Sequence, residues 1–150
     1  MSTENIKDLV DRYIAVSFSV EKKAGSLVKE QIGSDLTNDQ HFTLRYMNQV
    51  GTCTSSELAE VFDVQKSAIT AIIQRLWEKG LIQRTRDEKD RRVVYLTLTD
   101  KGNELYLKSE QRIHHLVESL ITKFDQSEIK QFIETFEKLN QVLIDYKVEE

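Results

Sequence analysis

Apolar residues recur at steps of three and four over most of the chain, a spacing typical of amphipathic helices. The first such stripe runs from about Glu4 to Gln31 and is broken at Gly33. At 1.5 Å per residue the helix is about 40 Å long, which is more than one small domain can cover. We therefore expect its apolar side to need a partner. That side consists of Ile6, Leu9, Val10, Tyr13, Val16, Val20, Ala24, Leu27 and Val28.

Two capping boxes mark the next helices. The residues Thr37 to Gln40 place a hydroxyl at the cap and an amide three residues on, which predicts a helix that continues to about Val50. Thr54 to Glu57 repeat the pattern and predict a short helix. The apolar side of the first is Phe42, Tyr46, Met47 and Val50, and that of the second is Leu58, Ala59 and Phe62.

A further helical pattern runs from about Gln65 to Lys79, and Gly80 is the expected left-handed stop. We expect one apolar side on this helix, made of Ala68, Ile69, Ile72, Ile73, Leu76 and Trp77.

The periodicity then changes to that of strands. A short strand is expected at 81–84 and a β-branched one at 93–99, with the charged stretch TRDEKDRR as the tip between them. Thr99 and Asp100 can cap a helix that runs to about Phe124, and Asp125 opens a carboxylate version of the capping box before the last helix. The predicted fold is mainly α with a small β-hairpin: four helices, the hairpin and two helices.

Composition narrows the class of protein. A chain of 150 residues and 17.5 kDa makes one domain or one compact subunit. It contains no proline, and no apolar run approaches the length of a membrane span. The charged start of the chain argues against a secretory signal, and the single cysteine, Cys53, cannot form an intramolecular disulfide. We therefore expect a cytoplasmic protein without membrane contact.

The charge is unevenly distributed. The net charge of the whole chain is −4, yet residues 65–92 carry +4, while 1–64 and 93–150 carry −4 each. A local basic patch attracts phosphate whatever the global sum. The middle of the chain is thus a candidate contact for nucleic acid, although alternating charge on solvated faces would give a similar count.

The segment 54–98 has the composition of a winged helix-turn-helix. The exposed side of its second helix carries small polar residues that would let the helix approach base edges in a major groove about 12 Å wide. We expect Ser67, Thr70 and Gln74 to read bases, with help from Lys66 and Arg75, and Gln65 at the start of the helix is a further candidate DNA contact.

The hairpin tip is rich in arginine. Asp90 and Arg92 lie two residues apart, so on an extended chain they project to the same side and can pair. An arginine held by a carboxylate is prepared to enter a minor groove, and Arg84, Arg86 and Arg91 would hold the phosphates on either side. A plain surface ion pair is the alternative.

Several motifs together resemble the MarR (multiple antibiotic resistance regulator) family. They include Lys79-Gly80-Leu81-Ile82 after the second helix and Asp90-x-Arg92 in the wing, and the resemblance extends over nearly the whole chain. The other matching elements are Leu36-Thr37-x-x-Gln40-x-Phe42, Glu57-Leu58-Ala59, Ser67 with Thr70, Arg75-Leu76, and Leu98-Thr99-x-x-Gly102. The chain departs from the family pattern at Gln65, where serine or threonine is frequent, and at Ala71, where arginine is frequent.

The resemblance implies a homodimeric transcription factor on a pseudo-palindromic operator, usually a repressor, with no catalytic residues. Residues 1–35 and 100–150 would form the dimerisation region and 36–99 the DNA-binding region. Two recognition helices would lie in successive major grooves and two wings in minor grooves. Many such proteins lose DNA affinity when a small-molecule effector or an oxidant acts on them. No cofactor is implied.

Four other interpretations can be weighed against DNA binding by a regulator of this kind. Cys53 near a helix start could be a redox switch, and His41, His114 and His115 invite a metal site, but we expect a small semi-buried thiol and no metal. Five aromatic residues, Tyr13, Phe18, Phe42, Tyr46 and Tyr106, could line a ligand pocket or equally belong to the core. A winged helix can also serve as a protein-interaction module, although that role would not need the arginines of the wing.

Overall fold

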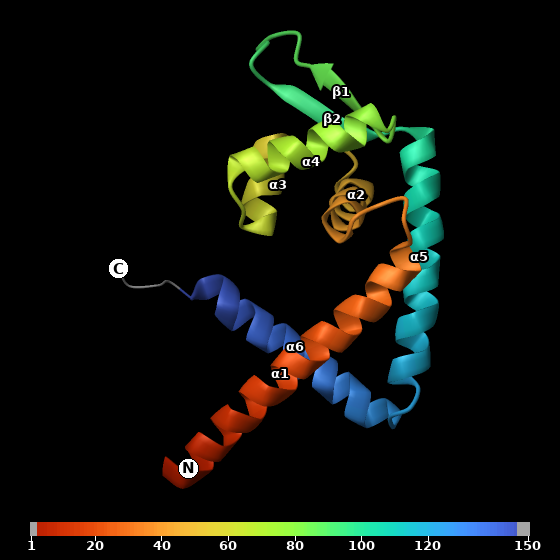
Figure 1. Ribbon diagram of the computed structural model, residues 1–150. Helices are drawn as coiled ribbons and strands as arrows, with labels where there is room; N and C mark the ends of the chain where they lie inside the picture. Colours follow the sequence, from red (N-terminus) through yellow and green to blue (C-terminus); the bar gives the residue numbers. More distant parts are fainter. Residues whose placement is uncertain (1–2, 147–150) are drawn as a thin grey trace. The chain divides into compact units, whose positions relative to one another are not determined.

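The computed structural model describes residues 3–146, in which four helices precede a two-stranded hairpin and two follow it (Figure 1). The order of elements expected from the sequence is confirmed. The elements are α1 (Thr3–Ile32), α2 (Asn38–Val50), α3 (Ser55–Phe62), α4 (Lys66–Glu78), β1 (Ile82–Arg86), β2 (Val94–Leu98), α5 (Asp100–Ile121) and α6 (Gln126–Asp145). The outermost residues of the predicted dimerisation region, 1–2 and 147–150, lie outside the described residues.

Helix α1 leaves its apolar side exposed. It ends where Gly33 adopts a φ of 79°, a left-handed conformation that favours glycine. Near this end Ile32 is buried and Val28 packs against the core. The large apolar residues further toward the N-terminus are 46–64% exposed, namely Ile6, Leu9, Val10, Tyr13, Ile14, Val16, Phe18 and Val20.

The capping predictions hold at α2 and α5, hold only for the threonine half of the box at α3, and fail at α6. The backbone nitrogen of Gln40 donates to Thr37 Oγ1 at 3.1 Å. Gln40 Oε1 accepts from the backbone nitrogen of Thr37 at 3.2 Å, so the box at α2 is complete. At α3 and α5, the hydroxyls of Thr54 and Thr99 accept from backbone amides. Asp125 occupies the cap position of α6 but makes no capping hydrogen bond with its side chain, because an exposed carboxylate and exposed first amides can both be hydrated instead.

The core lies between α2, α3, α4 and the hairpin. Its fully buried members include Leu44 of α2, Leu58 of α3 and Ile69 of α4, each 0% exposed. The other apolar members are Ile32, Leu36, Met47, Cys53, Ile73, Leu76, Leu81, Ile82, Leu96 and Tyr106.

The predicted apolar side of α2 is wrong in part. Phe42 and Val50 are 40% and 46% exposed, whereas the polar residues His41 and Thr43 are buried. Both side chains find a partner: His41 Nε2 lies 3.2 Å from Glu110 Oε2, and Thr43 Oγ1 donates to the Asp39 carbonyl, while His41 Nδ1 is buried without a hydrogen bond.

The expected apolar side of α4 also needs correction. Ile69, Ile73 and Leu76 are buried, but Ala68 is exposed and Trp77 is 47% exposed. Trp77 lies near the end of the helix, where a guanidinium from the hairpin, rather than the core, covers its ring.

The hairpin is antiparallel, with Ile82 opposite Leu98 and Arg86 opposite Val94. The first strand continues two residues beyond the predicted end, to Arg86. Cys53 forms an isolated bridge to Leu96, with backbone hydrogen bonds of 3.2 and 2.7 Å that tie the α2–α3 connection to the sheet. The loop of the hairpin extends away from the helices (Figure 1).

The chain divides into two compact units, Met1–Ile113 and His114–Glu150. The first unit contains the core just described. In the second, α6 buries none of its residues, and seven large apolar side chains on its surface or at its end are exposed: Phe132, Ile133, Phe136, Val142, Leu143, Ile144 and Tyr146. Among residues 3–146, no helix combines the length and apolar content that crossing a bilayer requires.

We predict that Gly102→Ala destabilises the protein by at least about 2 kcal/mol, because a Cβ at this buried position of α5 would overlap the Leu81 carbonyl group. Chemical denaturation measures the change. The matched control is Glu104→Ala, an exposed change on the same helix, which should shift the free energy of unfolding by less than about 0.5 kcal/mol. Equal stability of the two variants would contradict the close approach of α5 to Leu81.

Candidate nucleic-acid interface

Helices α3 and α4 pack against each other and are joined by a tight turn. Asp63 takes a left-handed conformation with φ 52° and its amide donates back to the Glu60 carbonyl. The Val64 amide likewise donates to the Ala59 carbonyl at 3.1 Å. These bonds satisfy the end of α3 and set the direction in which α4 leaves.

Helix α4 has an anchored side and a displayed side. Ile69, Ile73 and Leu76 lie in the core at 0%, 5% and 0% exposure. The residues that the sequence assigned to DNA contact lie outside that stripe. Gln65, Lys66, Ser67, Thr70 and Arg75 are exposed, and Gln74 is half-buried.

Two of the displayed side chains are held by neighbours. Thr70 Oγ1 donates to the Lys66 carbonyl at 2.9 Å, which leaves the oxygen able to accept. The Gln74 amide nitrogen donates to Glu78 Oε1 at 2.9 Å. Gln65 occupies the N-cap position without a side-chain capping bond, as expected of a residue that caps poorly.

The predicted pair in the wing is present. Arg92 donates to Asp90 from its backbone nitrogen and from Nε, both at 3.1 Å, and from Nη2 at 3.4 Å. The side-chain bond, followed by the backbone bond, lowers the pKa of the Asp90 carboxyl. The expected cause of the pairing was wrong, because these residues lie in a turn and not on an extended strand. The Arg92 side chain remains 92% exposed.

The remaining arginines of the hairpin lie in two different settings. Arg86 Nη1 donates to the Arg91 carbonyl at 2.6 Å, so these two residues brace the loop. Arg84 is turned onto α4, with Cζ 4.9 Å from the centroid of the Trp77 ring and Nη2 donating to Gln74 Oε1 at 2.8 Å. Sequence reasoning missed this contact, although the alternation of Ile82, Arg84 and Arg86 along the strand would have placed all three on one face.

A buried polar cluster supports α2 from α5. His41 is 0% exposed, and Glu110 also accepts from Arg45 Nε at 3.2 Å. Burial lowers the pKa of His41, although the hydrogen bond to Glu110 opposes the shift. Within residues 3–146, no three histidine, cysteine or carboxylate side chains are grouped as metal ligands would be.

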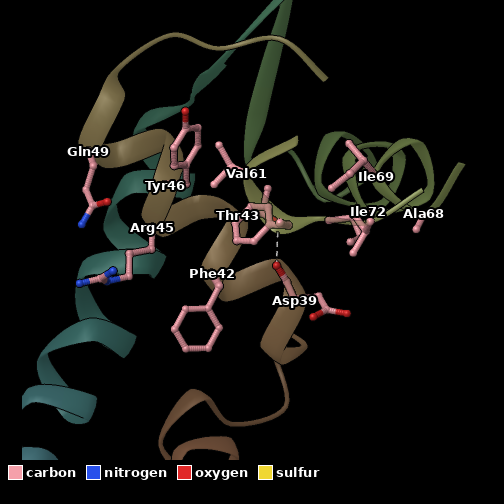
Figure 2. Close-up of a pocket in the computed structure, with 12 residues that line it drawn as sticks. Asp39, Phe42, Thr43, Arg45, Tyr46, Gln49, Val61, Ala68, Ile69 and Ile72 are labelled. Atoms are coloured by element: carbon pink, nitrogen blue, oxygen red, sulfur yellow. Dashed lines mark hydrogen bonds between the residues drawn. The ribbon is translucent and has the colours of Figure 1, made fainter. Parts of the chain in front are cut away.

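A cavity of about 470 Å³ lies between α2, α3 and α4. Figure 2 shows the rings of Phe42 and Tyr46 on one side and the side chain of Ile72 of α4 on another. Arg45 also belongs to the lining, but its guanidinium is turned toward α5 (Figure 2), where Nε donates to Glu110. Of the five aromatic residues considered for a pocket, Phe42 and Tyr46 line this one, Tyr106 is in the core, and Tyr13 and Phe18 are exposed on α1.

Comparisons with known proteins agree on one family. A family model described as "MarR family" matches residues 36–94. The HTH-type transcriptional repressor MdtR of Bacillus subtilis is 44% identical over 68 residues, which cover 45% of this chain and only 44% of that protein.

Two solved structures extend the likeness over most of the chain. Streptococcus pneumoniae FabT in complex with DNA is 27% identical, with a TM-score of 0.75 over 94% of this chain and 99% of that one. A mutant MarR from E. coli complexed with operator DNA has a TM-score of 0.76 over 88% of this chain and 96% of that one, and at 23% identity it shows the fold alone.

Cys53 is not poised for reaction. It is 1% exposed, and burial, followed by the negative charge of Glu57, raises the pKa of its thiol to about 11. At neutral pH the group is therefore a protonated thiol, a poor nucleophile.

We predict slow labelling of native Cys53 by iodoacetamide at pH 7.5, at least about tenfold slower than in the urea-unfolded protein, because both access and thiolate content are low. Mass spectrometry over time measures the rate. Cys53→Ser controls for modification of other residues. Equal rates in the folded and unfolded protein would restore the redox interpretation.

Proposed function

Because the chain belongs to the MarR family of winged helix-turn-helix transcriptional regulators, which are not enzymes, we propose that it binds a pseudo-palindromic operator in double-stranded DNA. The observation that carries the proposal is the two-sided character of α4, whose aliphatic stripe is buried while its polar side is displayed. This helix and the wing lie within the one stretch of the chain that is net positive.

In this proposal α4 lies in a major groove. Ser67, Thr70 and Gln74 contact base edges, and their small or amide side chains suit that approach. Lys66 and Arg75 flank them and contact phosphate or an adjacent base. Gln65 marks the start of the helix, where free backbone amides favour a phosphate oxygen.

The wing lies in the neighbouring minor groove. Arg92 enters it with its guanidinium oriented by Asp90, and the exposure of this arginine supports such a role. Arg86 and Arg91 lie on either side and hold phosphates. Arg84 was assigned to phosphate with them, but its contact with α4 favours a role on that helix instead.

The protein acts as a homodimer in the cytoplasm. Residues 1–35 and 100–150 form the dimerisation region and 36–99 the DNA-binding region. The exposed apolar side of α1 and the unburied α6 support the assignment, because apolar surfaces of this extent favour burial against another chain. A second copy presents two recognition helices, as a two-fold symmetric operator requires.

The regulator is a repressor that a small molecule releases. MdtR, the relative with 44% identity in the matched segment, carries the name of a repressor. The cavity between α2, α3 and α4 includes Ile69 and Ile72 on the side of α4 away from the proposed groove. An apolar ligand there would bias the position of α4.

We predict that the protein retards a duplex from the region upstream of its own gene, and that its affinity falls steeply between 50 and 200 mM salt, as phosphate contacts require. Arg92→Ala should weaken binding and make the salt dependence shallower by one to two counterions per dimer. Fluorescence anisotropy at several salt concentrations gives both quantities. The same preparation should sediment at twice the 17.5 kDa of the chain.

The matched control is Arg112→Ala, which removes the same charge from an exposed position on α5 and should leave the salt dependence unchanged. Absence of retardation in dilute buffer would favour a protein-interaction module instead. An equal loss of affinity in both variants would show that overall charge, and not the wing, governs binding.

A further inference from the structure

Arg84 lies on the face of the hairpin that meets the helices. Opposite residues of an antiparallel pair project to the same side, so Arg84 shares a face with its partner Leu96, which is 2% exposed. Ile82, two residues earlier, is likewise buried on that face. Register therefore places Arg84 on the face that meets α4. Arg86 shares this face but lies nearer the loop, where it donates to the Arg91 carbonyl.

Two contacts connect the hairpin to the displayed side of α4, and a third within the helix continues them. The guanidinium of Arg84 stacks over Trp77, its Nη2 donates to Gln74 Oε1, and Gln74 Nε2 donates to Glu78 Oε1. The donor and acceptor types are complementary at each step, since the carboxylate only accepts and the guanidinium only donates. The hydrogen bonds from Arg84 to Gln74 and from Gln74 to Glu78 therefore run in one direction, from the guanidinium to the carboxylate.

This direction fixes the orientation of the Gln74 amide, with Oε1 toward Arg84 and Nε2 toward Glu78. A glutamine amide can be turned by 180° at little cost when nothing distinguishes its two ends. Turned over, this amide would place its NH₂ group against the donors of Arg84 and its oxygen against the carboxylate of Glu78. The observed orientation leaves one N–H and one oxygen lone pair unused, which is the pair that a glutamine offers to the N7 and N6 groups of adenine.

We propose that Arg84 is a positioning residue that determines base preference at the base pair beneath Gln74, acting through the orientation of the Gln74 amide and not through the DNA backbone. The inference rests on the proposed function, since it requires Gln74 to face a base. The planar fork of arginine can stack on Trp77 and donate to Gln74 at the same time. The group that the oriented Gln74 amide would bind is the edge of an adenine in the major groove.

The test begins with selection of duplexes from a random pool by the full-length wild-type protein, followed by anisotropy titrations on the selected site and its single base-pair variants. In Arg84→Ala, discrimination should fall about tenfold at one base pair in each half-site, the order of magnitude of one lost oriented contact. Preferences at other positions and the salt dependence should remain those of the wild type. Gln74→Ala should lose discrimination at the same base pair, and the double variant should show no additional loss of discrimination.

Arg86→Ala is the matched control, because it removes an arginine from the same face of the same strand. It should make the salt dependence shallower and leave base preference unchanged. The contact itself can be observed in solution, because Trp77 is the only tryptophan of the chain. Iodide should quench its fluorescence more strongly in Arg84→Ala than in the wild type, once the guanidinium no longer covers the ring.

Retained base preference with a shallower salt dependence in Arg84→Ala would overturn the inference and make Arg84 a phosphate contact. Loss of discrimination at every base pair would also overturn it, because it would indicate general disorder of α4. Failure of the wild-type protein to select any sequence would instead contradict the proposed function itself. The two failures are therefore distinguishable.

Discussion

The structure depends on the burial of one aliphatic stripe on α4. Ile69, Ile73 and Leu76 lie in the core with residues from α2, α3 and the hairpin. Full burial of each side chain is worth about 1.5–3 kcal/mol, which is enough to fix the rotation of the helix about its axis. Once that rotation is fixed, Ser67, Thr70 and Gln74 must face outward. Every proposed contact between α4 and DNA follows from this one constraint.

The same stripe relates the displayed side of α4 to the cavity behind it. Ile69 belongs to the core and also lines the cavity, while Lys66 and Thr70 lie on the exposed side of the same helix. A ligand in the cavity would thus press on the residues that determine how α4 is held. The hairpin adds a second restraint through Arg84, so that the recognition helix is held from its buried side and from the wing.

Local patterns in the sequence were sufficient for much of the fold. The capping box at Thr37 and the pair Asp90 and Arg92 involve residues two or three apart, and both are present. Arrangements that depend on distant residues were not predictable in this way. His41 is buried because Glu110, 69 residues later, accepts its hydrogen bond, and periodicity alone assigned that side of α2 to solvent.

The candidate site shows the same division between local and distant contacts. The sequence predicted that the DNA-contacting residues of α4 lie outside the aliphatic stripe, because a helix period of 3.6 separates them, but it wrongly placed Ala68 and Trp77 on the buried side. It could not predict that Arg84 contacts α4 while the other wing arginines do not, since this contact depends on strand register and on the ring of Trp77. Local charge density indicated a cationic surface without indicating which of its cations point toward an outside partner.

In this account the outward side of α4 and the wing meet DNA, while α1 and α6 do not. Amide chemical shifts of the isotope-labelled protein, recorded with and without a selected duplex, test it most directly. We expect the changes to concentrate in residues 65–78 and 86–93, with α6 unaffected. Changes centred on α1 or α6, with none in α4, would contradict the account.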